Sequence, residues 1–244
     1  MALATATSGG AAGGAAREPA QVRRVPWNGR QTLQVDSTVG DVRVTGGRGR
    51  DIDVQVGRDG PSGAAVDALA VDIASTDETV AVTALQASGG KDSRLRTTIT
   101  IAMPSQMSVS HLAAFEGTVT LDGVLGGVDA KVDRGAIVGV DLGGRIRLET
   151  GSGDVTVRQL APPKVTSLHL RVFNGKATLG LTERPANARL LFLTLNGSVR
   201  SDIPATERAG FGPRFVEAAL GTGEPPYSVD VVRGDIVVTV AGGR

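Results

Sequence analysis

The sequence predicts an all-β protein, and in particular a β-solenoid of stacked two-strand coils joined by glycine turns. First, five units between residues 108 and 199 each consist of an alternating strand, a glycine and a second alternating strand. Second, these glycines are spaced by 18, 18, 22 and 22 residues, and such a period favours stacked coils. Third, 34 glycines and only 3% aromatic residues suit a thin aliphatic core. A β-sandwich or meander is the alternative fold.

Each unit keeps its apolar residues in period two on both sides of the glycine. In one unit Leu168, Leu170 and Val172 precede the glycine, and Ala177 and Leu179 follow it. One face of each strand is therefore predicted to be apolar. A tight corner often needs a positive φ, which glycine adopts without a Cβ clash. The turn glycines are Gly117, Gly135, Gly153, Gly175 and Gly197.

We expect residues 1–29 to be a low-complexity, basic N-terminal arm. Residues 1–20 are mainly Ala, Gly, Ser and Thr, a composition that is disordered on its own. The arm is a candidate docking element for an acidic protein surface or anionic lipid headgroups. A solvated linker, with the single tryptophan closing the end of the core, is the alternative. The candidate partner contacts are Arg17, Arg23, Arg24, Trp27 and Arg30.

Residues 30–105 are predicted to form an N-terminal β region that extends the repeat or caps it. The residues around Gly40 follow the pattern of the repeat, with Leu33 and Val35 before it and Val42 and Val44 after it. A cap is needed because an open end exposes a sheet edge and the apolar core. Further strands are expected at residues 52–56, 66–74, 80–85 and 95–102.

The regular repeats are assigned to residues 106–200 and are followed by a Pro-rich insertion at residues 201–227. Within the insertion we expect a short helical turn at residues 215–220. The insertion either covers the last coil or protrudes toward a partner, with Phe211 and Phe215 as candidate contacts. The alternating pattern then returns, so residues 228–244 are predicted to form the final coil.

Two exposed apolar residues are expected on the repeats themselves. Phe173 and Leu195 each stand two residues before a turn glycine, where alternation predicts an outward position. They belong to successive units, so we expect them to be adjacent and to mark a partner contact. The alternative is that the insertion buries them.

The composition argues against several classes of function. A formal net charge of +1 gives no field that points to nucleic acid. The absence of cysteine excludes disulfides and thiolate metal sites. The two histidines, His111 and His169, are predicted to lie about 14 Å apart, too far to share a metal ion. The carboxylates are scattered and aromatic residues are few, so we expect no enzyme activity and no catalytic, cofactor or metal site.

We also expect no transmembrane helix, because no stretch approaches 18 consecutive apolar residues. Residues 1–20 have neither the basic start nor the strongly apolar run of a signal peptide. These patterns predict a cytoplasmic protein with peripheral association at the membrane. The alternative is the cell envelope, if an export signal was missed.

A short motif carries a resemblance to a known family. A glycine, an aspartate and two apolar residues in alternation recur at residues 40–44, 153–157 and 234–238. Over residues 30–240 the chain resembles the bacterial "putative adhesin" β-strand-repeat family. The resemblance implies an envelope-associated, non-enzymatic β-solenoid, and it supplies no catalytic residue to carry over.

From the sequence we expect a non-catalytic scaffold or accessory subunit. It would dock onto the protein subunits of a larger assembly, as an extrinsic component on the cytoplasmic face of a membrane complex. An envelope-associated, adhesin-like binding module is the alternative. Neither hypothesis requires a cofactor.

Overall fold

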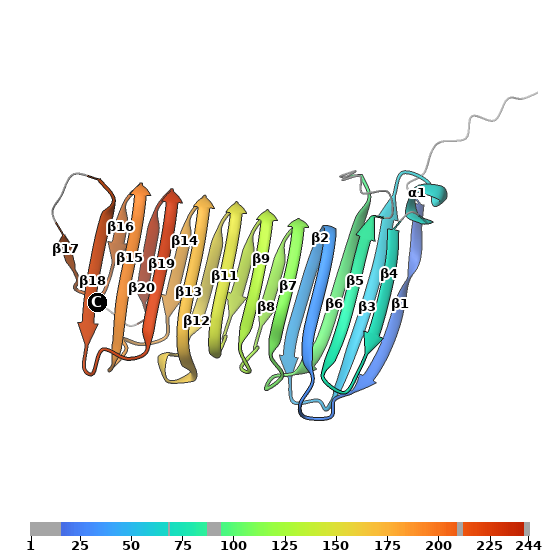
Figure 1. The fold of residues 1–244 in the computed structure, drawn as a ribbon, viewed down its shortest axis with the longest axis horizontal. Helices are drawn as coiled ribbons and strands as arrows, with labels where there is room; N and C mark the ends of the chain where they lie inside the picture. Colours follow the sequence, from blue (N-terminus) through green and yellow to red (C-terminus); the bar gives the residue numbers. More distant parts are fainter. Residues whose placement is uncertain (1–15, 68, 87–93, 209–211, 242–244) are drawn as a thin grey trace, which may run out of the picture.

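The computed structural model describes residues 16–67, 69–86, 94–208 and 212–241, and in these ranges the protein is almost entirely β. The helical elements there are α1 (Gly63–Asp67) and the short 3₁₀ helix η1 (Pro162–Lys164). The all-β prediction is therefore confirmed. The strands form two layers, sheet A and sheet B, and through the repeats the chain passes from one to the other in each coil (Figure 1).

Sheet B is parallel through its centre and antiparallel at both ends. Its strands from β5 to β15 pair in parallel, whereas β4, β18 and β17 are antiparallel to their neighbours. Its order in space is β4 (Leu69–Ser75), β5 (Thr79–Gln86), the first half of β2 (Thr32–Gly47), β7 (Val109–Glu116), β9 (Val128–Arg134), β11 (Gly144–Ser152), β13 (Val165–Asn174), β19 (Pro226–Arg233), β15 (Ala188–Asn196), β18 (Arg214–Leu220) and β17 (Thr206–Arg208).

Sheet A faces sheet B and follows the same sequence of coils. Its strands from β6 to β16 pair in parallel, and β3 and β1 are antiparallel. Its order in space is β1 (Ala16–Pro26), β3 (Asp51–Gly60), β6 (Arg96–Pro104), the second half of β2, β8 (Val119–Asp122), β10 (Ile137–Val140), β12 (Val155–Leu160), β14 (Ala177–Leu181), β20 (Ile236–Val240) and β16 (Val199–Ser201).

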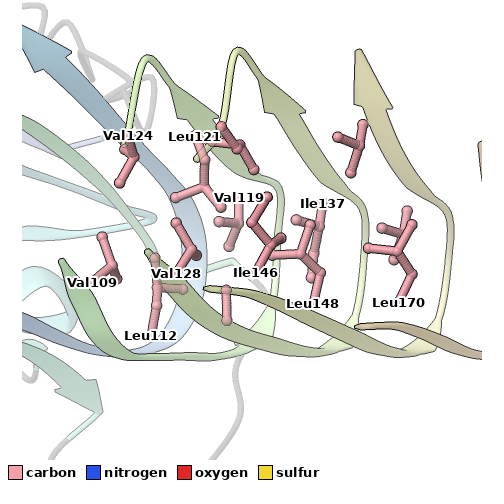
Figure 2. Packing of buried hydrophobic residues seen from close by; sticks show 14 of the residues in the cluster. Val109, Leu112, Val119, Leu121, Val124, Val128, Ile137, Ile146, Leu148 and Leu170 are labelled. Atoms are coloured by element: carbon pink, nitrogen blue, oxygen red, sulfur yellow. The ribbon is translucent and has the colours of Figure 1, made fainter. Parts of the chain in front are cut away.

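The core lies between the two sheets and consists of columns of aliphatic side chains. Leu148 and Leu170 point inward from sheet B and meet Ile137 and its neighbours in sheet A (Figure 2). The alternation in the sequence therefore predicts the buried face correctly. Tyr227, the only tyrosine, is fully buried in this core, and its hydroxyl donates to the Pro162 carbonyl oxygen at 3.4 Å. Burial raises the pKa of Tyr227 to about 12.

The turn glycines stack in a column in which each one contacts the preceding coil. The φ angles of Gly117, Gly135, Gly153 and Gly175 lie between 134° and 145°, as a glycine corner requires. A Cβ on Gly135 would lie well under 3.0 Å from the carbonyl oxygen of Gly117. The same is true of each later glycine toward the one before it in the stack. Any side chain here would push two coils apart.

The order of the coils in space differs from their order in the sequence. The C-terminal coil, formed by β19 and β20, was predicted to be the last one, and this is wrong. It lies between the coil of β13 and β14 and the coil of β15 and β16. Similarly, β2 lies between β5–β6 and β7–β8. The physical reason is that all coils share one register, so the alternating pattern alone does not choose a neighbour.

Antiparallel strands lie at the N-terminal end of both sheets and at the C-terminal end of sheet B, and two expectations need correction there. The predicted helical turn at residues 215–220 is wrong, because this segment is strand β18, paired with β15. Val216 and Ala218 face the core and Phe215 and Glu217 face outward, a period of two that a short apolar segment conceals. The expected arm at residues 1–29 includes β1, which pairs with β3 rather than standing free of the sheet.

Candidate functional site

The candidate partner contacts lie at opposite ends of the molecule. The basic residues and Trp27 belong to the end that carries β1, whereas Phe173, Leu195 and Phe215 belong to the end that carries β15 and β18 (Figure 1). The structure therefore does not bring the two predicted groups together. Phe211, another predicted contact, lies outside the described residues.

At the N-terminal end, most of the predicted contacts serve the fold. The backbone of Arg17 pairs with Asp59 in the β1–β3 ladder. Arg23 donates from Nη1 to the carbonyl oxygen of Ile73. Arg24 donates from Nε to Asp53 at 2.6 Å, and this hydrogen bond lowers the pKa of the carboxyl group. The N-terminal arginines thus fasten β1 to its neighbours.

Trp27 and Arg30 complete the predicted group at this end. The Trp27 ring is partly buried against the core, and its Nε1 donates to the Gln31 carbonyl oxygen at 3.1 Å. This geometry supports the closing role that was the alternative for Trp27. Arg30 is exposed, and its backbone N–H is bound by Asn28 Oδ1 at 2.9 Å in a turn.

At the C-terminal end, the predicted adjacency of Phe173 and Leu195 is wrong. Their strands, β13 and β15, are separated by β19, and Val232 of β19 takes the place between them. Both predicted residues are nevertheless exposed on sheet B, Phe173 by 40% and Leu195 by 50%. The surface between Phe173 and Leu195 is still apolar, because Val232 of the inserted coil lies between them.

These residues belong to a larger surface, which we call the C-terminal apolar face. Strand β15 is apolar on both sides: Leu190 and Phe192 are buried in the core, while Leu191 and Leu193 are half-buried on the outer side. The antiparallel partner of Leu193 on β18 is Phe215. The residues of the face are Phe173, Leu191, Leu193, Leu195, Phe215 and Val232.

Other strands of sheet B present charges at the matching positions. The row that ends in Leu193 runs through Lys131, Glu149, Arg171 and Asp230 on successive strands. In this row, the change from charged to apolar residues occurs at β15. Strands that are apolar on both sides normally have both sides covered. The face thus has the composition of a covered surface, although Leu195 is open to solvent.

Arginines form the rim of the C-terminal apolar face. Arg171 lies over the Phe173 ring and Arg208 lies over the Phe215 ring, each at 5.0 Å from the ring centroid. Arg208 also binds Glu217 at 3.1 Å, and Arg189 binds the same carboxylate at 3.0 Å. The guanidinium groups hold the edges of the face in place and leave its centre apolar.

The sequence contained the signal for Leu191 and Leu193, which were not predicted as contacts. From residue 190 to residue 195 the chain reads Leu-Leu-Phe-Leu-Thr-Leu, so both sides of this strand are apolar. The inward set was recognised through the repeat. Leu191 and Leu193 were not predicted, because the repeat pattern describes only the inward-facing residues of each strand.

The aspartates of the recurring motif have a structural role. Asp41, Asp154 and Asp235 each follow a turn glycine and accept the backbone N–H of the corresponding turn in a neighbouring coil, at 2.7–2.9 Å. Asp235 also accepts the hydroxyl of Ser198 at 2.8 Å, and these hydrogen bonds lower its pKa. The carboxylates therefore tie one coil to the next.

The described ranges contain neither a metal-binding cluster of side chains nor a membrane-spanning helix. Across these residues, three or more His, Asp or Glu side chains do not gather where they could hold a metal ion. In the same part of the chain, every helix is too short or too polar to span a bilayer.

Comparisons with known proteins find solved structures that are similar to the chain at low sequence identity. No family model matches the chain, and no curated protein matches it in sequence. One similar structure is a "putative cell adhesion protein" from Clostridium sporogenes, with 11% identity, a TM-score of 0.45, and coverage of 91% of this chain and 98% of that one. A "putative adhesin" from Bacteroides fragilis has 14% identity, a TM-score of 0.40 and coverage of 91% and 97%. A "putative adhesin" from Parabacteroides merdae has 10% identity, a TM-score of 0.37 and coverage of 90% and 96%.

Proposed function

We propose that the chain is a β-solenoid that serves as a non-catalytic binding module and that binds a protein partner through the C-terminal apolar face. The stack of coils supplies a flat, rigid support in this reading. The adhesin-like form of the module, which the recurring glycine–aspartate motif favours, is the leading version. An accessory subunit of a larger assembly is the second version.

One observation carries this proposal: β15 is apolar on both sides, whereas the four preceding strands of sheet B, β9, β11, β13 and β19, carry charged residues in the row that ends in Leu193. Leu191, Leu193 and Leu195 stand where the neighbouring strand β19 has Ser228, Asp230 and Val232. Burial of apolar surface is the main favourable term in protein association. A partner that covers these leucines gains that term without disturbing the core behind them.

The test compares leucine-to-serine substitutions at two places on sheet B. The Leu193→Ser/Leu195→Ser double variant removes apolar side chains from the face. The control is Leu85→Ser, which changes a leucine of similar exposure (43%) near the opposite end of sheet B. We expect the wild-type chain and the control to retain a partner from native extracts and the double variant to lose it. Retention by all three would overturn the proposal.

Separate extracts distinguish the two versions of the proposal. Binding that depends on Leu193 and Leu195 in an envelope fraction, but not in a cytosolic one, supports the adhesin-like module. The reverse pattern supports the accessory subunit. Circular dichroism of each variant checks that the substitutions on the outer side leave the fold intact.

A further inference from the structure

A basic hollow on the outer side of sheet B lies beside the C-terminal apolar face and is distinct from it. Its volume is about 330 Å³. It crosses three adjacent strands, β11, β13 and β19, because Arg147, His169 and Ser228 stand side by side in register. The residues that line it are Arg145, Ile146, Arg147, Ser167, Leu168, His169, Pro226 and Ser228.

The ionisable residues that line the hollow are Arg145, Arg147 and His169. Arg145 forms no ion pair with any residue that the structure describes. Arg147 approaches Glu149 only at 4.0 Å, and His169 approaches Asp230 only at 3.9 Å. The hollow thus has two guanidinium groups, one uncompensated and one weakly paired, and its lining contains no carboxylate.

Two hydroxyl groups and one proline ring complete the hollow. Within the described part of the chain, the Ser167 hydroxyl has no hydrogen-bond partner, and Ser228 makes only a long contact of 3.4 Å with Asp230. The exposed ring of Pro226 supplies apolar surface, whereas the side chains of Ile146 and Leu168 are buried in the core. Arg145 and Ser167 are paired across β11 and β13, so a guanidinium and a free hydroxyl stand next to each other.

The geometry points to a binding site for the phosphate or sulfate group of a monosaccharide-sized ester. Planar guanidinium groups bind such oxyanions with two parallel hydrogen bonds, and Arg145 and Arg147 present two of them from one side of one strand. Ser167 and Ser228 add neutral donors to the same anion. The Pro226 ring and a volume near the lower limit of ligand pockets suit one sugar ring. This site does not depend on the C-terminal apolar face.

Calorimetric titration of the full chain with glucose 6-phosphate, glucose 6-sulfate, inorganic phosphate and glucose tests this inference. We expect saturable binding of at least one of the two esters, weaker binding of inorganic phosphate and none of glucose. The Arg145→Gln/Arg147→Gln variant should bind the ester at least about 10-fold more weakly, because each lost hydrogen bond involves a charged group.

Two further variants separate a built site from general attraction to positive charge. Arg43→Gln removes an exposed arginine from the outer side of sheet A and should leave ester binding unchanged. Ser167→Ala keeps the charge of the hollow and should weaken binding by a few-fold. The inference is overturned if neither ester saturates, if inorganic phosphate binds as tightly as the esters, or if Arg43→Gln loses as much affinity as the double variant.

Discussion

Single glycines and aspartates set the spacing between the coils. The turn glycines lie so close to the neighbouring coil that a methyl group has no space, and all of them except Gly197 have φ angles that other residues rarely adopt. The aspartate that follows some of these glycines accepts a backbone N–H of the adjacent coil. The glycine and the aspartate of the sequence motif therefore both make contacts between neighbouring coils.

Replacing a turn glycine should destabilise the protein strongly. Gly135→Ala places a Cβ against the Gly117 carbonyl group at a φ of 140°, and we expect a loss of about 2 kcal/mol or more in the free energy of unfolding. Gly49→Ala is the matched control, because a Cβ there meets nothing within 4 Å. Urea denaturation measures both, and equal stability of the two variants would refute the glycine column.

The aspartate contacts predict a dependence of stability on pH. Hydrogen bonds from Ser198 lower the pKa of Asp235 below its unfolded value of about 3.9. The stabilisation is therefore fully present above that value and is lost as the pH falls through the lower, folded-state pKa. Asp235→Asn should be less stable than the wild type near neutral pH, and the difference should shrink below about pH 4.

Urea denaturation at a series of pH values measures this difference for Asp235→Asn. Asp122→Asn, on an exposed strand position of the same sheet, is the control. A constant gap between wild type and Asp235→Asn across the acid range would show that the carboxylate charge is not involved.

The strands and coils use one register, and this property permits the insertion of the C-terminal coil. Strand β19 pairs in parallel with β13 on one side and with β15 on the other. Because the inward and outward positions agree in all three strands, the coil fits without exposing core residues. The chain thus leaves a gap between β13 and β15, and the C-terminal coil with β19 occupies that gap.

Engineered cysteine pairs test this order, since the natural chain contains no cysteine. Residue pairs 169/228 and 191/228 are neighbours in register, so cysteines there should form disulfides. The pair 169/191 is two strands apart, about 9–10 Å, and should stay reduced. Mass spectrometry of the oxidised variants reads the result. A disulfide at 169/191 would instead support coils stacked in sequence order.

Much of each element was predictable from the sequence, but its neighbours were not. Alternation identified the buried side of the repeat strands, and the glycines identified the corners, because both depend on residues close in the chain. The place of β19 depends on which of several equivalent edges it joins. Likewise, the segment Phe215 to Leu220 is short and largely apolar, so its pattern fits the period of a helix as well as that of a strand such as β18.

The candidate site was predictable only in part for the same reason. The outward positions of Phe173 and Leu195 follow from alternation along one strand, whereas the insertion of Val232 between them follows from pairing across strands. The arginines of β1 looked like a free basic arm because Pro19 and the small residues around it hide a strand pattern. Their partners, such as Asp53, lie far away in the sequence.

At the scale of the whole molecule, the described residues form two layered sheets with edge strands at both ends. Its edge strands at the C-terminal end, β16 and β17, have only three residues each, and short edges oppose the addition of further strands. At the other end the edge strands are the arginine-rich β1 in sheet A and β4 in sheet B. Growth by end-to-end stacking is therefore disfavoured, and association is expected on the outer side of sheet B instead.

The measurement that tests the central claim most directly is site-specific photo-crosslinking in native cells. A photoreactive amino acid replaces Leu195 in the C-terminal apolar face or, in a parallel strain, Leu85 near the other end of the sheet. We predict one discrete adduct from position 195 and none from position 85, and the adduct should disappear when Leu193→Ser is added. Equal adducts from both positions, or none from position 195, would contradict the claim that this face binds a partner.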